Sequence, residues 1–337
     1  KMIINFFFDN RIGGPHINIF RISKILKKKI IHVTIGKSKY SKIKLINLRY
    51  ISKLFYPFEV IINTLQIIIY FRKYNCIFLS NSIYNVAPVI AGTILGKKTY
   101  WYLLEEPNFF SKIIFFLINK FFKFEILTIS KNICKKLKIK NYKYFPPYFY
   151  PKKIKIKKFN NKQLKILSVG NINKVKNHFF AIKKLSKLKL NYKYEIIGSK
   201  INTQVNLYNY LKNYLTNKKL KNKIKFLGYK KQTEILKIIN KFDIFLLPSI
   251  TEGTPISLLE AMSLGKICVC SKVGDIPLII KNNQNGFLID LNEKSFLKTI
   301  YKINSMGEKE IKKMQINAIK TINKNFSDKK IYSKILK

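Results

Sequence analysis

One stretch of the chain decides its fold: Pro248-Ser249-Ile250-Thr251-Glu252-Gly253-Thr254-Pro255-Ile256-Ser257-Leu258-Leu259-Glu260-Ala261-Met262. It follows an apolar run at 244–247 that is typical of a buried strand, and it turns into a helix that we expect to begin near Ile256. This order places the free N–H groups of a helix N-terminus at the carboxyl edge of a parallel sheet. Phosphate and sugar oxygens bind readily at such an edge.

Two carboxylates flank the start of this expected helix. Glu252 lies in the loop, and Glu260 lies about one turn inside the helix. Carboxylates spaced in this way can accept hydrogen bonds from several hydroxyls of one polyol ligand. The backbone between them is expected to hold further ligand oxygens through Gly253, Thr254, Pro255 and Ile256.

The stretch resembles the Glu-x7-Glu signature of retaining glycosyltransferases with two Rossmann-like domains, the GT-B architecture of family 4, also called group 1. The resemblance continues through 265–277, where the family shows a Gly, a short strand and a Gly-Gly-Ile-Pro-like turn, and through Asn285-Gly286-Phe287-Leu288. The alternative is an ordinary strand–loop–helix unit. The resemblance implies an α/β fold of two facing Rossmann-like domains, with the active site in the cleft between them.

A second part of the resemblance follows the expected strand at 164–169. The family shows Gly-Arg-x4-Lys there, and the Arg and Lys neutralise the donor diphosphate. Gly170 and Lys176 match this pattern, whereas Asn171 stands in the Arg position. Because Asn171 carries no charge, stabilisation of the departing diphosphate is expected to rest on Lys176. The alternative is a Lys-rich turn in a Lys-rich protein.

Phe226-Leu227-Gly228 resembles the family's strand–Gly turn beside the nucleotide base. The alternative is a tight turn that needs Gly for its backbone conformation.

A Gly pair follows the first expected strand. The family often places such a pair beside the sugar and diphosphate, so Gly13 and Gly14 are candidates for close backbone approach. The segment is not a Gly-x-Gly-x-x-Gly motif, so no nicotinamide site is expected. His16 is placed either to line the cleft or to cap a helix.

Two acidic residues, Glu105 and Glu106, end another expected strand of the first half. The family often has a His near this point, but Tyr102 or Leu104 stands here instead. The glutamates are candidates for a base or a positioning group at the acceptor. The alternative is an acidic loop at a sheet edge.

Apolar runs alternate with helix-length segments along the chain, as in parallel α/β folds. We expect an N-terminal, acceptor-binding domain (1–145), a linker (146–163), a C-terminal, nucleotide-sugar-binding domain (164–306) and a helical segment (307–337) that packs back toward the first domain. Expected strands lie near 3–8, 30–34, 76–79, 99–103, 125–129, 164–169, 194–197, 224–227 and 243–247. Expected helices lie near 17–27, 58–72, 86–95, 109–123, 131–137, 178–188 and 233–239.

The formal net charge is +50, which favours polyanions or anionic lipid as partners. Much of this charge is explained by a Lys-rich, Asn-rich and Ile-rich composition, which is the composition that an AT-rich genome encodes. Arginine is scarce, so specific nucleic-acid recognition is not expected. The four cysteines form no cluster with histidines, and no Asp-x-Asp occurs, so we expect neither a metal site nor a cofactor.

The segment 109–124 mixes Phe, Ile and Leu with lysines. We interpret it as a helix that faces the core, the alternative being a helix that lies in a membrane interface. No apolar run reaches the ~18 residues of a membrane-spanning helix. We expect a cytoplasmic protein whose first domain associates peripherally with the anionic inner face of the cytoplasmic membrane.

The resemblance implies transfer of a sugar from a nucleotide-sugar to a hydroxyl of a glycan or lipid-linked acceptor, with retention of anomeric configuration, in surface polysaccharide or glycolipid assembly. Glu252 and Lys176 would be the catalytic residues. One alternative is a degenerate, non-catalytic subunit that binds membrane or polyanion, favoured by Asn171. The other is a nucleotide-sugar epimerase of similar fold.

Overall fold

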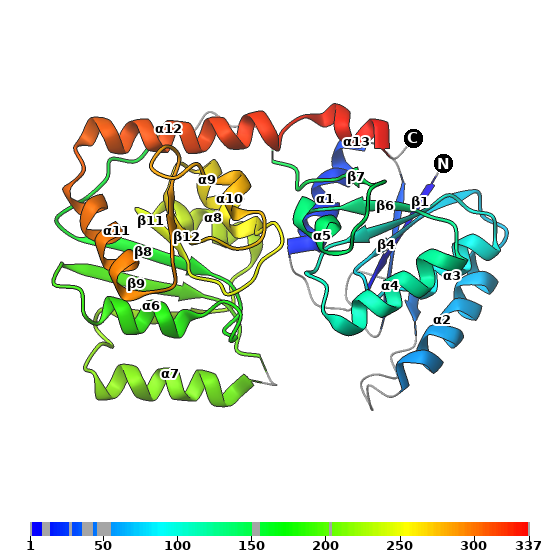
Figure 1. Ribbon diagram of the computed structural model, residues 1–337, viewed down its shortest axis with the longest axis horizontal. Coiled ribbons are helices and arrows are strands. Elements are labelled where there is room, and N and C mark those ends of the chain that lie inside the picture. Colours follow the sequence, from blue (N-terminus) through cyan, green and yellow to red (C-terminus); the bar gives the residue numbers. More distant parts are fainter. Residues whose placement is uncertain are drawn as a thin grey trace. The chain divides into compact units, whose positions relative to one another are not determined.

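The structure of the protein is a computed structural model that describes residues 2–8, 14–26, 29–35, 43–45, 55–149, 156–201 and 204–335. The chain divides into two compact units. The first comprises Lys1–Tyr148 and Asp328–Lys337, and the second comprises Phe149–Ser327. Both are α/β units built on a parallel sheet, which confirms the predicted fold class (Figure 1).

In the first unit, the described strands form a seven-stranded sheet. These strands are β1 (Met2–Phe7), β2 (Ile30–Ile35), β3 (Ile43–Leu45), β4 (Cys76–Asn81), β5 (Thr99–Leu103), β6 (Glu125–Thr128) and β7 (Lys143–Tyr144). The described helices are α1 (Gly14–Leu26), α2 (Tyr56–Phe71), α3 (Ala87–Ile94), α4 (Phe109–Phe121), α5 (Lys131–Lys136) and α13 (Lys329–Ile335). The strand order is β3-β2-β1-β4-β5-β6-β7.

In the second unit, the described strands form a six-stranded sheet. They are β8 (Leu164–Val169), β9 (Tyr192–Ile197), β10 (Ile224–Gly228), β11 (Ile244–Leu247), β12 (Ile267–Ser271) and β13 (Phe287–Ile289), in the order β10-β9-β8-β11-β12-β13. The described helices are α6 (His178–Leu185), α7 (Val205–Asn217), α8 (Gln232–Asn240), α9 (Ile256–Ser263), α10 (Ile276–Ile279), α11 (Glu293–Ser305) and α12 (Glu308–Asn325).

The strand order reverses at the first strand of each sheet. β1 pairs in parallel with β2 on one side and β4 on the other, and β8 pairs in parallel with β9 and β11. In open parallel sheets, ligands bind outside the carboxyl ends of the strands at such a reversal. We therefore expect a ligand site of the second unit at the loops that follow β8 and β11.

The predicted elements are confirmed, apart from shifts at their ends. The strand expected at 194–197 begins at Tyr192, and the helix expected at 178–188 ends at Leu185. Among the described elements, sequence reasoning missed β3, β7, α7, α10 and α11. Helix α7 was missed because it is rich in Asn and Tyr and buries only Leu211 and Leu215, so its apolar stripe is weak.

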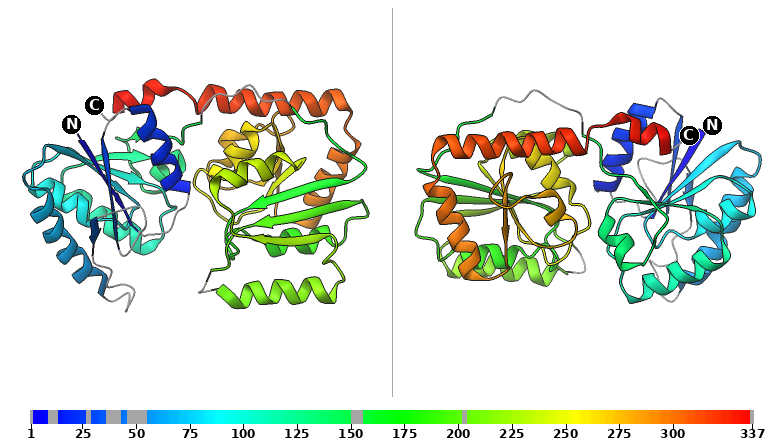
Figure 2. Two further views of the ribbon diagram at one scale, coloured as in Figure 1. Left: turned by 180° about the vertical axis from the view of Figure 1, so that it is seen from behind. Right: turned by 45° about the horizontal axis from the view of Figure 1, so that its top comes forward.

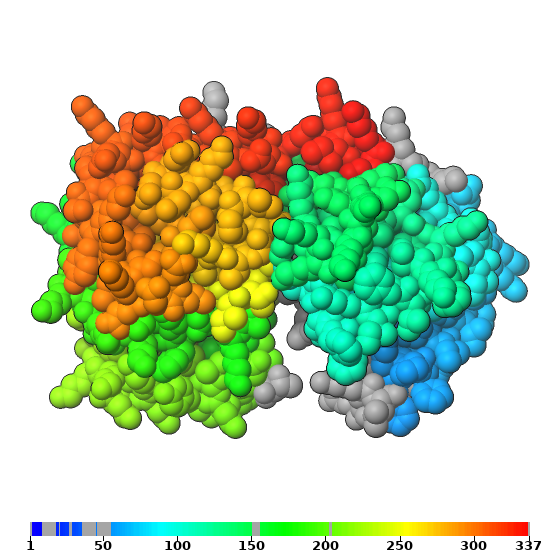
Figure 3. Space-filling view, viewed as in Figure 1, coloured from blue at the N-terminus to red at the C-terminus, as the bar shows by residue number. Residues whose placement is uncertain are grey.

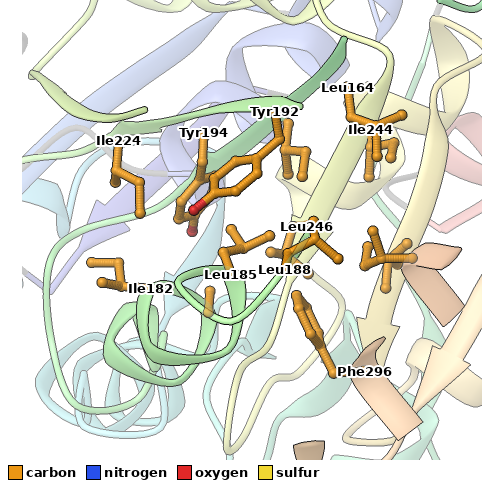
Figure 4. Packing of buried hydrophobic residues seen from close by; sticks show 14 of the residues in the cluster. Leu164, Ile182, Leu185, Leu188, Tyr192, Tyr194, Ile224, Ile244, Leu246 and Phe296 are labelled. Atoms are coloured by element: carbon orange, nitrogen blue, oxygen red, sulfur yellow. The ribbon is translucent and has the colours of Figure 1, made fainter. Parts of the chain in front are cut away.

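The second unit has a hydrophobic cluster on each face of its sheet, one of them between the strands and helices α6 and α11. Tyr192 and Tyr194 of β9 and Leu246 of β11 pack against Leu185 of α6 and Phe296 of α11 (Figure 4). The buried hydroxyl of Tyr194 is satisfied, since it lies 2.8 Å from the hydroxyl of Ser168. The core thus fixes β8 beside β9 and β11, which sets where their loops begin.

The C-terminal segment expected at 307–337 is divided between the two units. Helix α12 belongs to the second unit, whereas α13 belongs to the first and lies beside α1 (Figure 2). Tyr332 of α13 is buried, packs edge-on against Phe145 and Tyr148, and donates a hydrogen bond of 3.0 Å to the carbonyl of Pro146. Of the expected linker at 146–163, residues 150–155 lie outside the described residues.

The prediction that segment 109–124 faces the core is wrong for most of its apolar side chains. The N-terminus of helix α4 is capped, because the Asn108 side chain accepts a hydrogen bond of 2.9 Å from Ser111 N–H. It buries only Ser111 and Phe115, whereas Phe109 and Phe110 are more than 70% exposed. No helix among the described residues is both long enough and apolar enough to cross a membrane.

Candidate functional site

An ion pair joins the two loops at the strand reversal of the second unit. Lys176 lies in the loop after β8, and Glu252 lies in the loop after β11. The Lys176 ammonium lies 2.6 Å from the Glu252 carboxylate. The two residues are 76 positions apart in sequence, so only the adjacency of β8 and β11 brings them together. The structure thus unites the two predicted catalytic residues.

Both members of this pair are largely withdrawn from solvent. The side chains of Lys176 and Glu252 are 21% and 9% exposed. The hydroxyl of Ser249, which is fully buried, donates a second hydrogen bond of 2.6 Å to the same carboxylate oxygen. A carboxylate with two such donors is fixed in position. Sequence reasoning missed Ser249, although it stands three residues before Glu252.

The loop after β8 is shaped so that the Lys176 side chain can cross it. A Cβ atom at Gly170 would lie only 3.1 Å from the Lys176 Cδ and Cε atoms, so the stem of the lysine occupies the space that any other residue would fill. The two loops also meet through their backbones, because Ile250 N–H donates to the Val175 carbonyl at 2.8 Å. The position of Lys176 is therefore set by local packing as well as by its ion pair.

The turn after β12 contacts the loop after β11 and fixes its position. A Cβ atom at Gly274 would lie 2.0 Å from the Glu252 carbonyl oxygen, and the backbone there has a φ of +56°. Only glycine fits such a position without displacement. Asp275 anchors the same loop: its N–H donates to the Gly253 carbonyl at 3.1 Å, and its carboxylate accepts from the Thr254 hydroxyl at 2.7 Å.

Helix α9 begins where the sequence predicts, at Ile256, with Pro255 as its N-cap residue. Among the described residues, no side chain caps this N-terminus. Glu260 lies one turn into the helix and is only 3% exposed. Its carboxylate accepts a hydrogen bond of 2.5 Å from the side-chain amide of Gln232, the first residue of α8, which sequence reasoning missed.

His178 holds the start of the loop after β8. Its Nε2 atom lies 3.3 Å from the Gly170 carbonyl oxygen. Burial, with a smaller contribution from the charge of Lys176, lowers the pKa of His178 to about 4. The imidazole is therefore neutral at pH 7 and can donate one N–H to this carbonyl.

The other predicted residues of the second unit are placed as follows. The side-chain oxygen of Asn171, an exposed residue, accepts a hydrogen bond of 3.4 Å from Ser199 N–H, at the carboxyl end of the neighbouring strand β9. Gly228 ends β10 with a φ of +69°, and no atom of the described residues lies within 4 Å of where its Cβ would be. Both residues therefore lie at the same edge of the sheet as Lys176.

In the first unit, the predicted candidates are less closely grouped. Gly13 lies outside the described residues, and Gly14 and His16 lie in the first turn of α1. Glu105 accepts from Ile83 N–H at 3.2 Å, in the loop after β4 and hence at the strand reversal. Glu106 instead accepts from Asn132 at 2.8 Å and pairs with a lysine of α5. Glu106 thus has structural partners, and Glu105 is the better placed of the two.

The family model for glycosyl transferases group 1 matches residues 149–321, slightly more than half of the chain. The chain belongs to this family. The match begins at the second unit and contains Lys176, Glu252 and Glu260, so the family predicted from the sequence is confirmed.

Curated relatives match shorter segments of this glycosyltransferase-family chain. The amylovoran biosynthesis glycosyltransferase AmsK of Erwinia amylovora is 32% identical over 167 residues, 47% of this chain and 40% of AmsK. A UDP-Gal:alpha-D-GlcNAc-diphosphoundecaprenol alpha-1,3-galactosyltransferase of Escherichia coli is 36% identical over 85 residues, 25% of this chain and 21% of that enzyme. The matches thus span less than half of each relative's length.

Solved structures match almost the whole chain. HepE of Anabaena, in complex with UDP and glucose, has a TM-score of 0.84 at 15% identity and covers 99% of this chain and 98% of its own. The lipopolysaccharide outer core galactosyltransferase WaaB has a TM-score of 0.74 at 17% identity, covering 99% and 97%. At such identities the likeness shows the fold, which confirms the predicted GT-B type.

Substitution of Gly274 by Ala should displace the loop that carries Glu252. The added Cβ meets backbone rather than a flexible side chain, and the left-handed backbone adds strain of about 1 kcal/mol. We expect lower stability in urea unfolding and faster hydrogen exchange at the Asp275 N–H, which bonds to Gly253. Gly96→Ala is the matched control, because Gly96 has a φ of +61° but open space around it. Equal effects of the two substitutions would contradict this account.

Stability should depend on the protonation of His178. Its pKa is about 4 in the folded protein and about 6.5 when unfolded, so only the unfolded state takes up a proton between these values. The stabilisation is present above pH ~6.5 and is lost as pH falls, by about 2 kcal/mol between pH ~7 and pH ~5. Thermal melts at both pH values should show a smaller drop for His178→Gln, which keeps a donor but does not titrate. The same drop in both proteins would contradict the assignment.

Proposed function

We propose that this protein transfers a sugar from a nucleotide-sugar to a hydroxyl group of an acceptor, with retention of anomeric configuration. The observation that carries the proposal is the Lys176–Glu252 ion pair, at the strand reversal of a unit that belongs to the group 1 family. The fold neighbour HepE is described in complex with UDP and with UDP-glucose, which supports a nucleotide-sugar as donor.

The chemistry needs charge of both signs at one place. As the bond between the anomeric carbon and the diphosphate oxygen breaks, positive charge develops on the sugar and negative charge on the diphosphate. Lys176 stabilises the departing diphosphate, and Glu252 binds sugar hydroxyls and stabilises the positive sugar. In the structure, the two residues neutralise each other. Donor binding exchanges this ion pair for contacts of each residue with the donor.

Residues at the same edge of the sheet make the remaining contacts with the donor. The N-terminus of α9 has no side-chain cap, so the amides around Gly253 and Ile256 are directed at donor oxygens. Glu260 accepts from the ribose hydroxyls and releases Gln232 as it does so. The turns at Gly170 and Gly228 allow the diphosphate and base to approach the backbone. Asn171 adds a neutral donor where the family usually has Arg.

The acceptor is a glycan or a lipid-linked glycan, and Glu105 is our candidate for its positioning group or base. Relatives named for amylovoran and colanic acid biosynthesis support a role in the assembly of surface polysaccharide. The net charge of +50 supports peripheral contact with the anionic inner face of the cytoplasmic membrane. This contact places the enzyme where lipid-linked acceptors lie.

Substitution of each site residue should have its own kinetic signature. Lys176→Ala and Glu252→Ala should lower kcat by about 100-fold, since one lost stabilising group costs on the order of 3 kcal/mol in the transition state. Glu260→Gln should mainly raise KM for the donor. The measurement is nucleotide release from a panel of nucleotide-sugars, with and without acceptor.

Lys184→Ala is the matched control, because Lys184 is 17% exposed and pairs with Glu293 at 2.8 Å away from the site. It should leave kcat unchanged, although both lysine variants lose a similar ion pair. Wild-type rates in folded Lys176→Ala protein would contradict the proposal and favour a non-catalytic subunit. Conversion of the donor to an isomeric nucleotide-sugar without acceptor would favour an epimerase.

Activity should be independent of divalent metal, because Lys176 and the N-terminus of α9 supply the positive charge that a metal would supply to the diphosphate. The chain has no Asp-x-Asp motif that would bridge a metal to a diphosphate. Rates in excess chelator should equal rates in magnesium or manganese. Loss of activity in chelator with recovery on adding metal would show that the charge assignment is wrong.

A further inference from the structure

Helix α2 buries polar side chains in its first half and exposes apolar side chains along its outer side. Its buried stripe begins with Glu59 and Asn63, each 1% exposed, and Glu59 is the only charged residue within the helix. Its outer stripe is made of large apolar side chains that are each more than half exposed: Phe58, Ile61, Leu65 and Ile69. A helix on the surface of a water-facing protein shows the opposite pattern. An exposed apolar stripe of this kind is typical of a surface that binds a partner.

Helix α4 has a similar outer face. Phe109, Phe110, Phe116, Leu117 and Phe121 are each more than half exposed. A single large apolar side chain at the surface needs no explanation, but contiguous apolar faces on two helices mark a binding surface.

The two outer faces belong to one layer of helices. Helix α3 contacts α2 along its length, and the Thr93 hydroxyl of α3 donates to the Lys123 carbonyl after α4 at 2.9 Å. Ile94, at the end of α3, is 60% exposed. The views in Figure 1 and Figure 2 show α2, α3 and α4 in this order on the first unit, and Figure 3 shows α4 at the surface in turquoise. We call the outer sides of α2 and α4, with Ile94, the apolar face.

Basic residues border the apolar face. Lys120 and Lys123 are exposed at the end of α4, and Arg72 and Lys73 are exposed directly after α2. Lys120 lies over the ring of Phe121 at 5.5 Å, so its stem covers apolar surface while its ammonium stays outside. Large apolar side chains beside lysines are the composition of helices that lie in a membrane interface.

A pocket of about 290 Å³ opens on the α4 side of this surface. Phe115, Phe116 and Ile139 give it apolar walls, and the basic residues Lys138 and Lys140 also line it. Phe116 belongs to both the pocket and the apolar face. The pocket thus combines an apolar lining with positive charge, as the headgroup region of an anionic phospholipid requires.

We propose that the apolar face enters the outer part of an anionic bilayer, with the bordering lysines at the lipid headgroups. A second copy of the chain fits the surface less well, because each copy carries a net charge of +50 and would repel the other. Anionic lipid instead complements both the charge and the apolar side chains. The surface is independent of the proposed sugar transfer, because binding to lipid requires neither donor nor acceptor.

The test is cosedimentation of the full chain, without donor, with vesicles of phosphatidylcholine alone and of equal parts phosphatidylcholine and phosphatidylglycerol. Wild-type protein should bind the anionic vesicles more tightly. Ile69→Glu and Phe116→Glu should each weaken that binding about tenfold, since each replaces a large apolar group with a charge that anionic lipid repels. Leu278→Glu in the second unit, where Leu278 is 65% exposed, is the matched control and should bind as wild type does.

Fluorescence of the single tryptophan, Trp101, which packs 5.5 Å from Phe115 of α4, reports whether each variant is folded. Folded variants that bind vesicles as tightly as wild type would overturn the proposal. So would a stable dimer of the wild type, in light scattering without lipid, that Ile69→Glu or Phe116→Glu dissociates, because the apolar face would then be an interface between copies. Donor turnover by the same variants in solution should stay at the wild-type level, so that a failure here is distinct from a failure of the proposed transfer.

Discussion

The candidate site depends on one interaction, the ion pair of Lys176 and Glu252 across the carboxyl ends of β8 and β11. Two opposite charges that are both largely withdrawn from water are stable only as partners, and removing one partner from such a pair is costly. The fold supplies what the pair needs: Gly170 leaves room for the lysine stem, Ser249 holds the carboxylate, and Gly274 admits the loop that carries it.

The same physical constraint links fold and function in the second unit. A parallel sheet whose order reverses at β8 places the loops after β8 and β11 next to each other at its carboxyl edge. These two loops present Lys176, Glu252 and the start of α9. A ligand with a diphosphate and several hydroxyls matches a site with one ammonium, two carboxylates and an uncapped helix N-terminus.

Much of this could be predicted from the sequence, because strand, turn and helix signals around 248–262 are local. The start of α9 at Ile256 follows from the Pro before it. The family resemblance predicted Glu252 and Lys176 as catalytic residues, but their ion pair was not predicted. The supporting residues could not be predicted: Gln232, His178 and Asp275 act through contacts that only the packed sheet creates. The apolar composition of α4 favoured the prediction that this helix faces the core. Only the structure shows that most of its phenylalanines are exposed.

The measurement that tests the central claim most directly is the affinity of wild type and Lys176→Ala for a nucleoside diphosphate and for the corresponding monophosphate, by calorimetric titration. If Lys176 leaves Glu252 to bind the diphosphate, wild type prefers the diphosphate and the variant loses most of that preference while it keeps its affinity for the monophosphate. If the variant keeps the full preference, or loses affinity for both ligands equally, the ion pair is structural and Lys176 does not contact the departing group.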